Sequence, residues 1–288
     1  MNRNEIYNRI TEKLIIKIES GVIPWRRNWS IGSPTNMISK RPYNGINFLS
    51  LIAEDHPSPY YLSFLQCKEK GATINKGATG SLIVFWKVCE RNIEEGNKGS
   101  ARIPFLRYSY TFNLSDTSLC NTEAQRTSIT SAEELISKLQ NLPPIKNNYR
   151  RCAYSLIDDF ITLPVISDFD NQAEYYSALF HEAIHSTGHP SRLNRISAHA
   201  DHEQYSEEEL VAELGSSFLC AQAGISNSVI ENQAAYLQGW MKKLKQYPEV
   251  LIRASIQAKN AVEYLLTPVK EEENMCAAID NHQSCATY

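Results

Sequence analysis

The sequence has no segment that would carry the chain into or across a membrane. No apolar run approaches the roughly 18 residues that a membrane-spanning helix needs. The first ten residues contain no hydrophobic core of a secretory signal. We therefore expect a cytoplasmic protein with no membrane partner.

The cysteines have neither the number nor the spacing of a disulfide-rich or zinc-knuckle protein. They are odd in number, form no C-x-x-C pair, and lie at positions 67, 89, 120, 152, 220, 276 and 285. This pattern predicts reduced thiols, most of them in the core. Helix-turn-helix, zinc-finger and RNP signatures are also missing, so we do not expect sequence-specific recognition of duplex DNA.

Charge of both signs is present, but it is divided unevenly along the chain. The formal net charge is −3, yet residues 1–150 carry 20 Lys and Arg against 13 Asp and Glu, a net of +7. Residues 151–288 carry 9 against 19, a net of −10. A basic half beside an acidic half predicts two domains with different partners. The partner expected for the basic N-terminal domain is a polyanion. Two ordinary solvated surfaces are the alternative.

A polar stretch at 115–148 separates the two halves, and we place the boundary near residue 125. This gives an N-terminal domain at 1–125, a C-terminal domain at 126–268 and a polar tail at 269–288 that we expect to be disordered. We predict an α+β protein with an N-terminal α/β domain and a mainly helical C-terminal domain that contains a short β-hairpin or sheet.

Hydrophobic periodicity and turn residues predict the individual elements. In the first half we expect helices at 2–20, 46–53 and 60–71, and strands at 81–88 and 105–113 joined by a hairpin loop at 91–100. In the second half we expect a helix near 131–140 and short hairpin strands near 152–154 and 160–164. Further helices are predicted at 175–185, 206–219, 227–246 and 248–265.

The acidic half contains a metal-binding motif, the H-E-x-x-H pattern of residues 181–185, in a segment of helical periodicity. Because residues four apart share a helix face, His181 and His185 can bind the same metal ion. Glu182 would lie beside the open coordination position and act as the general base. The pattern predicts one zinc ion, or a similar divalent ion, per chain. A chance pentapeptide on a buried helix is the alternative.

A third ligand is expected from the helix at 206–219, where Glu209 and Glu213 are four apart on one face. In the gluzincin arrangement a Glu on a following helix completes the site, and a carboxylate four residues later supports one of the His ligands. We therefore favour Glu209 as the ligand and Glu213 as the supporting carboxylate. Ser206 and Glu209 also match a capping box, in which case Glu213 would be the ligand.

Other histidines offer weaker ligand sets. The pattern H-E-x-x-H-x-x-G-x-x-H matches through Gly188, but its last His would fall at Ser191. His189 comes two residues too early, and Gly188 is expected to end the helix. His199 and His202, in a polar connecting segment, are the remaining candidate ligands.

The basic half contains a run that alternates aromatic and guanidinium groups. Its members are Trp25, Arg26, Arg27 and Trp29. Single-stranded DNA exposes base faces that stack on aromatic rings and phosphates that attract Arg and Lys. The residues that would extend such a surface are Arg41, Tyr43, Asn47, Lys76, Lys87 and Arg107. The alternative is that both tryptophans are core anchors flanked by solvated arginines.

Longer stretches of the chain match a known family. In the first half they include Pro24-Trp25, Tyr43-x-Gly45-x-Asn47, Gly71-Ala72-x-x-x-Lys76-Gly77 and Val84-Phe85-Trp86. In the second half they include Asp159-x-Ile161-x-x-Pro164, the H-E-x-x-H segment, Arg192-Leu193-x-Arg195 and Glu209-Leu210-x-Ala212-Glu213. By these motifs residues 1–265 resemble the ArdC-type antirestriction proteins of conjugative plasmids, which are also similar to the N-terminal part of certain plasmid-borne primases.

The resemblance implies a domain that binds single-stranded DNA and a zincin-like metallopeptidase domain, in a protein that protects incoming plasmid DNA from host restriction. A protein or peptide substrate and a component of the restriction system are the further partners that it suggests.

The chain departs from the family pattern at two positions. The family usually has Gln where this chain has Asp116, and we expect Trp where it has Ser186. Tyr236 and His189 are candidates for the group that stabilises the oxyanion. The rival hypothesis is a DNA-coating protein whose metal site is structural or inactive.

Overall fold

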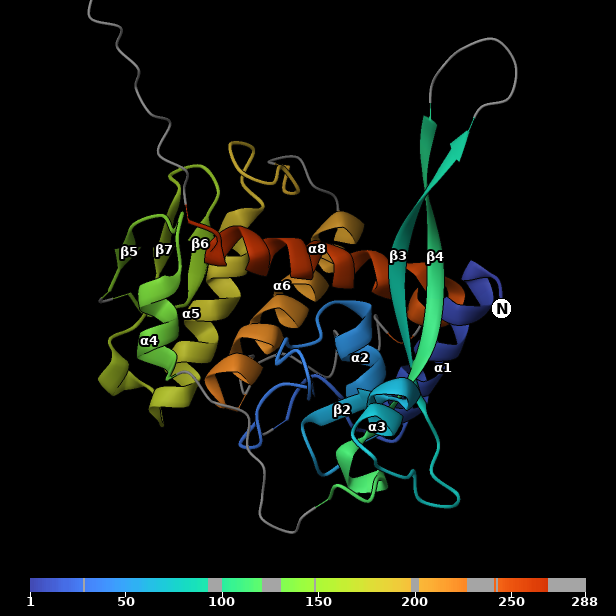
Figure 1. Ribbon diagram of the computed structural model, residues 1–288. Coiled ribbons are helices and arrows are strands. Elements are labelled where there is room, and N and C mark those ends of the chain that lie inside the picture. The colour runs from blue at the N-terminus through green and yellow to red at the C-terminus, as the bar shows by residue number, and fades with distance from the viewer. Residues whose placement is uncertain are drawn as a thin grey trace, which may run out of the picture.

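The structure is a computed structural model that describes residues 1–27, 29–92, 100–120, 131–147, 149–197, 202–226, 241 and 243–268. Side chains are described outside 86–92, 100–105, 202 and 203. Helices and strands are mixed along the chain, which confirms the predicted α+β class (Figure 1). None of the described helices combines the length and the apolar character needed to cross a bilayer.

Helix α1 (Arg3–Glu19) confirms the helix predicted at 2–20. Asn2 and Glu5 form a capping box, so the first free backbone N–H groups are satisfied. The periodicity of the sequence predicts one apolar stripe of Ile6, Ile10, Leu14, Ile15 and Ile18, and all of these are buried except Ile15, which is half-buried. This face packs α1 against the core of the molecule.

A four-stranded sheet with the order β1-β2-β4-β3 follows α1. Its strands are β1 (Thr35–Asn36), β2 (Tyr60–Ser63), β3 (Ser81–Asn92) and β4 (Ser100–Asn113). Only β1 and β2 pair in parallel, and β3 and β4 form a long antiparallel hairpin whose turn lies outside the described residues. Helix α2 (Ile46–Ile52) packs on β3, and the 3-10 helix η1 (Leu114–Asp116) follows β4.

The predicted helix at 60–71 is wrong in its first part. Residues Tyr60–Ser63 form strand β2, and helix α3 (Phe64–Glu69) begins only after it. Ser63 has extended backbone and forms a capping box with Gln66, which fixes the start of the helix. Tyrosine favours strands, and pairing of β2 with β4 decides the conformation of this segment.

The second half places a small sheet and three long helices together. Helix α4 (Ala132–Lys138) precedes a sheet of order β5-β7-β6, built from β5 (Ile145–Lys146), β6 (Ala153–Ser155) and β7 (Phe160–Thr162). After the 3-10 helix η2 (Ile166–Asp168) come α5 (Gln172–Thr187), α6 (His202–Ala223) and α8 (Glu249–Leu266). The antiparallel pair β6–β7 confirms the predicted hairpin. The domain boundary near 125, the helix predicted at 227–246 over most of its length, and the tail at 269–288 lie outside the described residues.

Both halves of the chain contribute to one hydrophobic core. Trp29 packs on Phe48 of α2 with ring centroids 5.2 Å apart, and Phe48 packs on Phe218 of α6 at 4.7 Å. The Ser217 hydroxyl of α6 donates to the carbonyl of Trp25 at 2.7 Å. The N-terminal half is thus packed directly on the helix that was predicted to supply the third metal ligand.

Candidate metal site

Helix α5 carries the H-E-x-x-H motif inside the protein. Asn171 caps the helix by accepting the N–H of Glu174 at 3.1 Å. His181 is 5% exposed and Glu182 is 8% exposed. Helix α6 packs closely on α5 because Gly215 faces Ile184, and a Cβ at this glycine would lie 2.8 Å from the Ile184 side chain. This close approach brings the two helices that hold the site within ligand distance.

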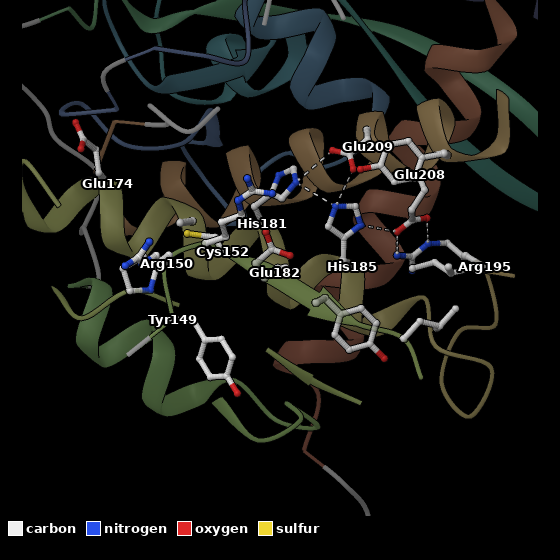
Figure 2. Close-up of a pocket in the computed structure, with 18 of the residues that line it drawn as sticks. Tyr149, Arg150, Cys152, Glu174, His181, Glu182, His185, Arg195, Glu208 and Glu209 are labelled. Atoms are coloured by element: carbon white, nitrogen blue, oxygen red, sulfur yellow. Dashed lines mark hydrogen bonds and ion pairs between the residues drawn. The ribbon is translucent and has the colours of Figure 1, made fainter. Parts of the chain in front are cut away.

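Three side chains from α5 and α6 converge on one point (Figure 2). The Nε2 atoms of His181 and His185 are 3.0 Å apart, and each lies 3.5 Å from a different carboxylate oxygen of Glu209. One ligand atom from each residue lies within 4.8 Å of the others. Two ligand atoms held tetrahedrally at about 2.0–2.1 Å from one zinc ion are about 3.4 Å apart. The three residues therefore fit a divalent metal ion.

Glu213, the alternative ligand and predicted support for a His, has another partner. Its carboxylate, 2% exposed, receives hydrogen bonds from Nε and Nη2 of Arg26, the first at 3.0 Å. The capping-box interpretation is also wrong, because α6 begins at His202 and Ser206 lies inside the helix. The structure thus brings Glu209 to the two histidines, and Glu213 joins α6 to the N-terminal half.

The carboxylate beside the metal ligands is Glu208, which sequence reasoning missed. Its Oε1 lies 3.4 Å from His185 Nδ1, on the side of the ring away from Glu209 (Figure 2). Arg195 binds the same carboxylate through two nitrogens, at 2.8 and 3.1 Å, and also donates to the carbonyl of Ile184 at 3.0 Å. A carboxylate on the second ring nitrogen fixes the tautomer and orientation of a ligating His. The sequence feature that could have pointed to this contact was Arg195 in the Arg192-Leu193-x-Arg195 motif.

The charges of the histidines and of the carboxylates around them support one another. Burial alone would lower the pKa of His185, but hydrogen bonds with Glu208 and Glu209 raise it well above its ordinary value. Burial likewise favours the neutral form of Glu209, yet hydrogen bonds with His181 and His185 hold the pKa of its carboxyl well below the ordinary range. A metal ion bound here would replace the protons between the histidines and Glu209 as the positive charge that balances the carboxylate.

The segment that follows α5 ends this helix and contacts the turn between β6 and β7. Gly188 is the C-cap residue, as predicted, and a Cβ there would lie 2.5 Å from Ile196, so only glycine fits. Arg192 binds both carboxylate oxygens of Asp159 at 2.8 Å and thereby ties the β6–β7 turn to α5. His189 instead hydrogen-bonds Ser191, 2.7 Å away, in the turn that follows.

The metal ligands open into a cavity of about 1680 Å³. Its wall opposite α6 is formed by the segment that leads into β6, and the labelled side chains of this wall are Tyr149, Arg150 and Cys152 (Figure 2). Glu182 faces this space beside the two histidines. The remaining candidates His199 and Tyr236 lie outside the described residues, and so does the side chain of His202. His181, His185 and Glu209 could thus hold a divalent metal ion in the lining of a large cleft.

Comparison with known proteins agrees with this geometry. Residues 130–257 match the family model of a zincin-like metallopeptidase, and residues 4–112 match that of the N-terminal domain of the anti-restriction factor ArdC. The metal-free crystal structure of antirestriction ArdC from plasmid R388 has 31% sequence identity and a TM-score of 0.75. The match covers 90% of this chain and 96% of that one. The chain belongs to the ArdC family of antirestriction proteins.

Further relatives of this ArdC-family protein differ in length. A Mn(II)-bound structure of the R388 ArdC matches with a TM-score of 0.74 at 30% identity. DNA primase TraC of Escherichia coli is 28% identical over 92% of this chain but only 27% of its own length, so the chain spans about a quarter of that primase. Protein y4eC of Sinorhizobium fredii is 28% identical over 91% of both chains.

The two tryptophans predicted to stack on DNA are in the core of this ArdC-family fold. Trp25 is 0% and Trp29 2% exposed, so the expectation of exposed rings is wrong and the core-anchor alternative describes both. Arg26, 10% exposed, is occupied by Glu213 and is not a solvated flank. Arg27 is partly exposed, lies over the Trp29 ring and pairs with Asp55 at 3.0 Å. The alternating run therefore joins the two halves of the chain.

The other predicted DNA contacts are spread over the N-terminal half. Asn47 is structural, because its amide exchanges two hydrogen bonds of 2.7 Å with the backbone of Val84 and so pairs the outer edge of β3. Tyr43 is half-buried, and its hydroxyl accepts from Asn36 at 3.3 Å. The exposed members are Arg41, Lys76 and Arg107. Lys87 lies on β3, and its side chain is outside the described part.

Proposed function

We propose that this protein is an ArdC-type antirestriction protein that binds single-stranded DNA and carries a zinc-dependent peptidase site, and that it protects incoming plasmid DNA from host restriction. The observation that carries the proposal is the convergence of His181, His185 and Glu209 at the floor of a large cleft. It occurs in a chain that matches nearly the whole length of an antirestriction protein. We propose zinc as the metal because two imidazoles and one carboxylate are a ligand set typical of zinc enzymes.

Peptide hydrolysis is the reaction that these residues suit. A zinc ion bound by the three ligands would supply Lewis acidity, polarising the scissile carbonyl and making water more acidic. Glu182, buried beside both histidines, takes a proton from the water that adds to the carbonyl carbon. As the C–N bond breaks, the carboxyl of Glu182 returns that proton to the leaving amine. Glu208 and Arg195 hold His185 in its orientation throughout.

The decisive experiment separates chemistry from metal binding. Glu182→Gln should keep about one equivalent of zinc but lower the hydrolysis of fluorescently labelled casein by roughly 10²- to 10⁴-fold. Asp170→Asn, an exposed carboxylate at the rim of the same cavity, is the matched control and should behave as the wild type. Transfer of a restriction-sensitive plasmid into a restricting host is then compared for both variants. Full protection by Glu182→Gln would reject peptidase action as the basis of protection and leave DNA coating.

DNA binding is proposed for the basic half. Its net charge of +7 and its match to the ArdC N-terminal domain support a polyanionic partner. The full chain should bind a labelled oligothymidine more tightly than the matching duplex, and its affinity should fall steeply with salt as phosphate counterions are released. Equal affinity for duplex and single strand would contradict this part of the proposal. A protein or peptide substrate and a component of the restriction system are the further partners that we propose.

A further inference from the structure

The exposed apolar side chains of the β3–β4 hairpin are all aromatic in its described part. Tyr108 is 39%, Tyr110 36% and Phe85 46% exposed. The hairpin is long, and Figure 1 shows its two strands running past α1 and beyond the helical body. Three partly exposed aromatic rings gathered on two neighbouring strands indicate a binding surface.

The strand register gives this surface two sides. Tyr108 and Tyr110 are two apart on β4 and share one face, with ring centroids 6.2 Å apart and planes at 87°. Their partners on β3 are Val84 and Leu82, both buried, so the tyrosines lie at the rim of the core. Phe85 and Arg107 are cross-strand partners on the opposite face.

Arginines lie next to the rings on both faces. On the first, Arg9 of α1 reaches the hydroxyl of Tyr110 at 3.4 Å. On the second, the exposed Arg107 lies beside Phe85. Exposed rings interleaved with guanidinium groups match a ligand that presents flat π-faces and negative charges at short intervals. Single-stranded DNA has both, whereas the base faces of a duplex are covered by stacking.

We infer that this hairpin is the single-stranded-DNA surface of the protein, with Tyr108 and Tyr110 as stacking residues and Arg9 and Arg107 as phosphate contacts. The inference rests on the proposed function, since it names the site at which the proposed ligand binds. It replaces the run at residues 25–29, whose tryptophans are buried in the core. A competing exposed patch on α3, at Phe64 and Leu65, is half aliphatic and fits a protein partner better than bases.

The test uses the full chain and a labelled oligothymidine. Tyr108→Ala and Tyr110→Ala should each weaken binding roughly 5- to 150-fold at every salt concentration, because loss of stacking is not screened. Tyr108→Phe and Tyr110→Phe keep the ring and should bind as the wild type. Tyr108→Leu/Tyr110→Leu keeps apolar bulk at the rim of the core but removes the stacking faces, so it should bind weakly while melting near the wild-type temperature. Tyr247→Ala changes an exposed tyrosine in the acidic half and is the matched control.

The arginines have a separate signature. Arg9→Ala and Arg107→Ala each remove one phosphate-binding group, which should reduce the slope of log affinity against log salt by about 0.7. Wild-type protein that binds no oligothymidine would reject the proposed function and the hairpin together. Wild-type binding with unchanged affinity in the tyrosine-to-leucine double variant would overturn the hairpin alone. Tyrosine variants that bind DNA normally but fail to protect a plasmid would assign the hairpin to a protein partner and likewise overturn it.

Discussion

The ion pair between Arg26 and Glu213 should be among the most sensitive contacts in the molecule. The two side chains are 10% and 2% exposed and share two hydrogen bonds. Arg26→Met removes one partner and leaves a buried carboxylate, and such changes destabilise proteins by about 3–5 kcal/mol. With a shift of about 2–4 °C per kcal/mol for a chain of this size, the melting temperature should fall by roughly 6–20 °C.

The reverse and the paired substitution complete the test. Glu213→Leu should be similarly damaging, because the guanidinium of Arg26 would then be the unpaired buried charge. Arg26→Met/Glu213→Leu removes both charges and should recover most of the loss in urea unfolding. Lys138→Met breaks an exposed pair with Glu134 and should leave the unfolding curve in place. Single variants within about 1 kcal/mol of the wild type, or a double variant as unstable as either single one, would refute the argument.

Three further predictions concern the metal site and acid stability. Glu208→Gln should weaken zinc binding roughly 10- to 100-fold in competition with a chelator, because the carboxylate that positions His185 is lost. The control Glu207→Gln should leave zinc binding unchanged. Equal effects of the two variants would show that Glu208 does not position His185. Glu209→Gln should reduce zinc stoichiometry more than Glu213→Gln, and the opposite order would reassign the third ligand. Burial favours the neutral form of Glu54, but hydrogen bonds from His56, Lys13 and Ser81 lower the pKa of its carboxyl to about 2. The lowered pKa contributes stability that is complete above the pKa of the unfolded chain, so stability should decline as the pH falls from about 4.5 toward 2. Glu54→Gln should flatten that decline in thermal melts. A decline that is unchanged in the variant would exclude the Glu54 carboxyl as its source.

Local patterns in the sequence predict most of the described helices, the longer strands and two of the three candidate metal ligands. The stripe of α1, the β6–β7 hairpin and the pairing of His181 with His185 depend on contacts within a few residues, which periodicity and spacing encode directly. The motifs along the chain likewise indicate the ArdC family, and the similarity to the R388 protein confirms it. The helix predicted over Tyr60–Ser63 is wrong because pairing with β4 decides the conformation of this segment.

Tertiary structure decided what each charged or aromatic side chain of the site contacts. Spacing in the sequence selects Glu209 and Glu213 and passes over Glu208. The packing of α6 against α5 and the N-terminal half gives the three carboxylates different partners. The same packing buries Trp25 and Trp29, while the strand register leaves rings on β4 exposed. Such contacts join residues far apart in the chain, so they depend on how helices and strands pack and not on the composition of any one segment.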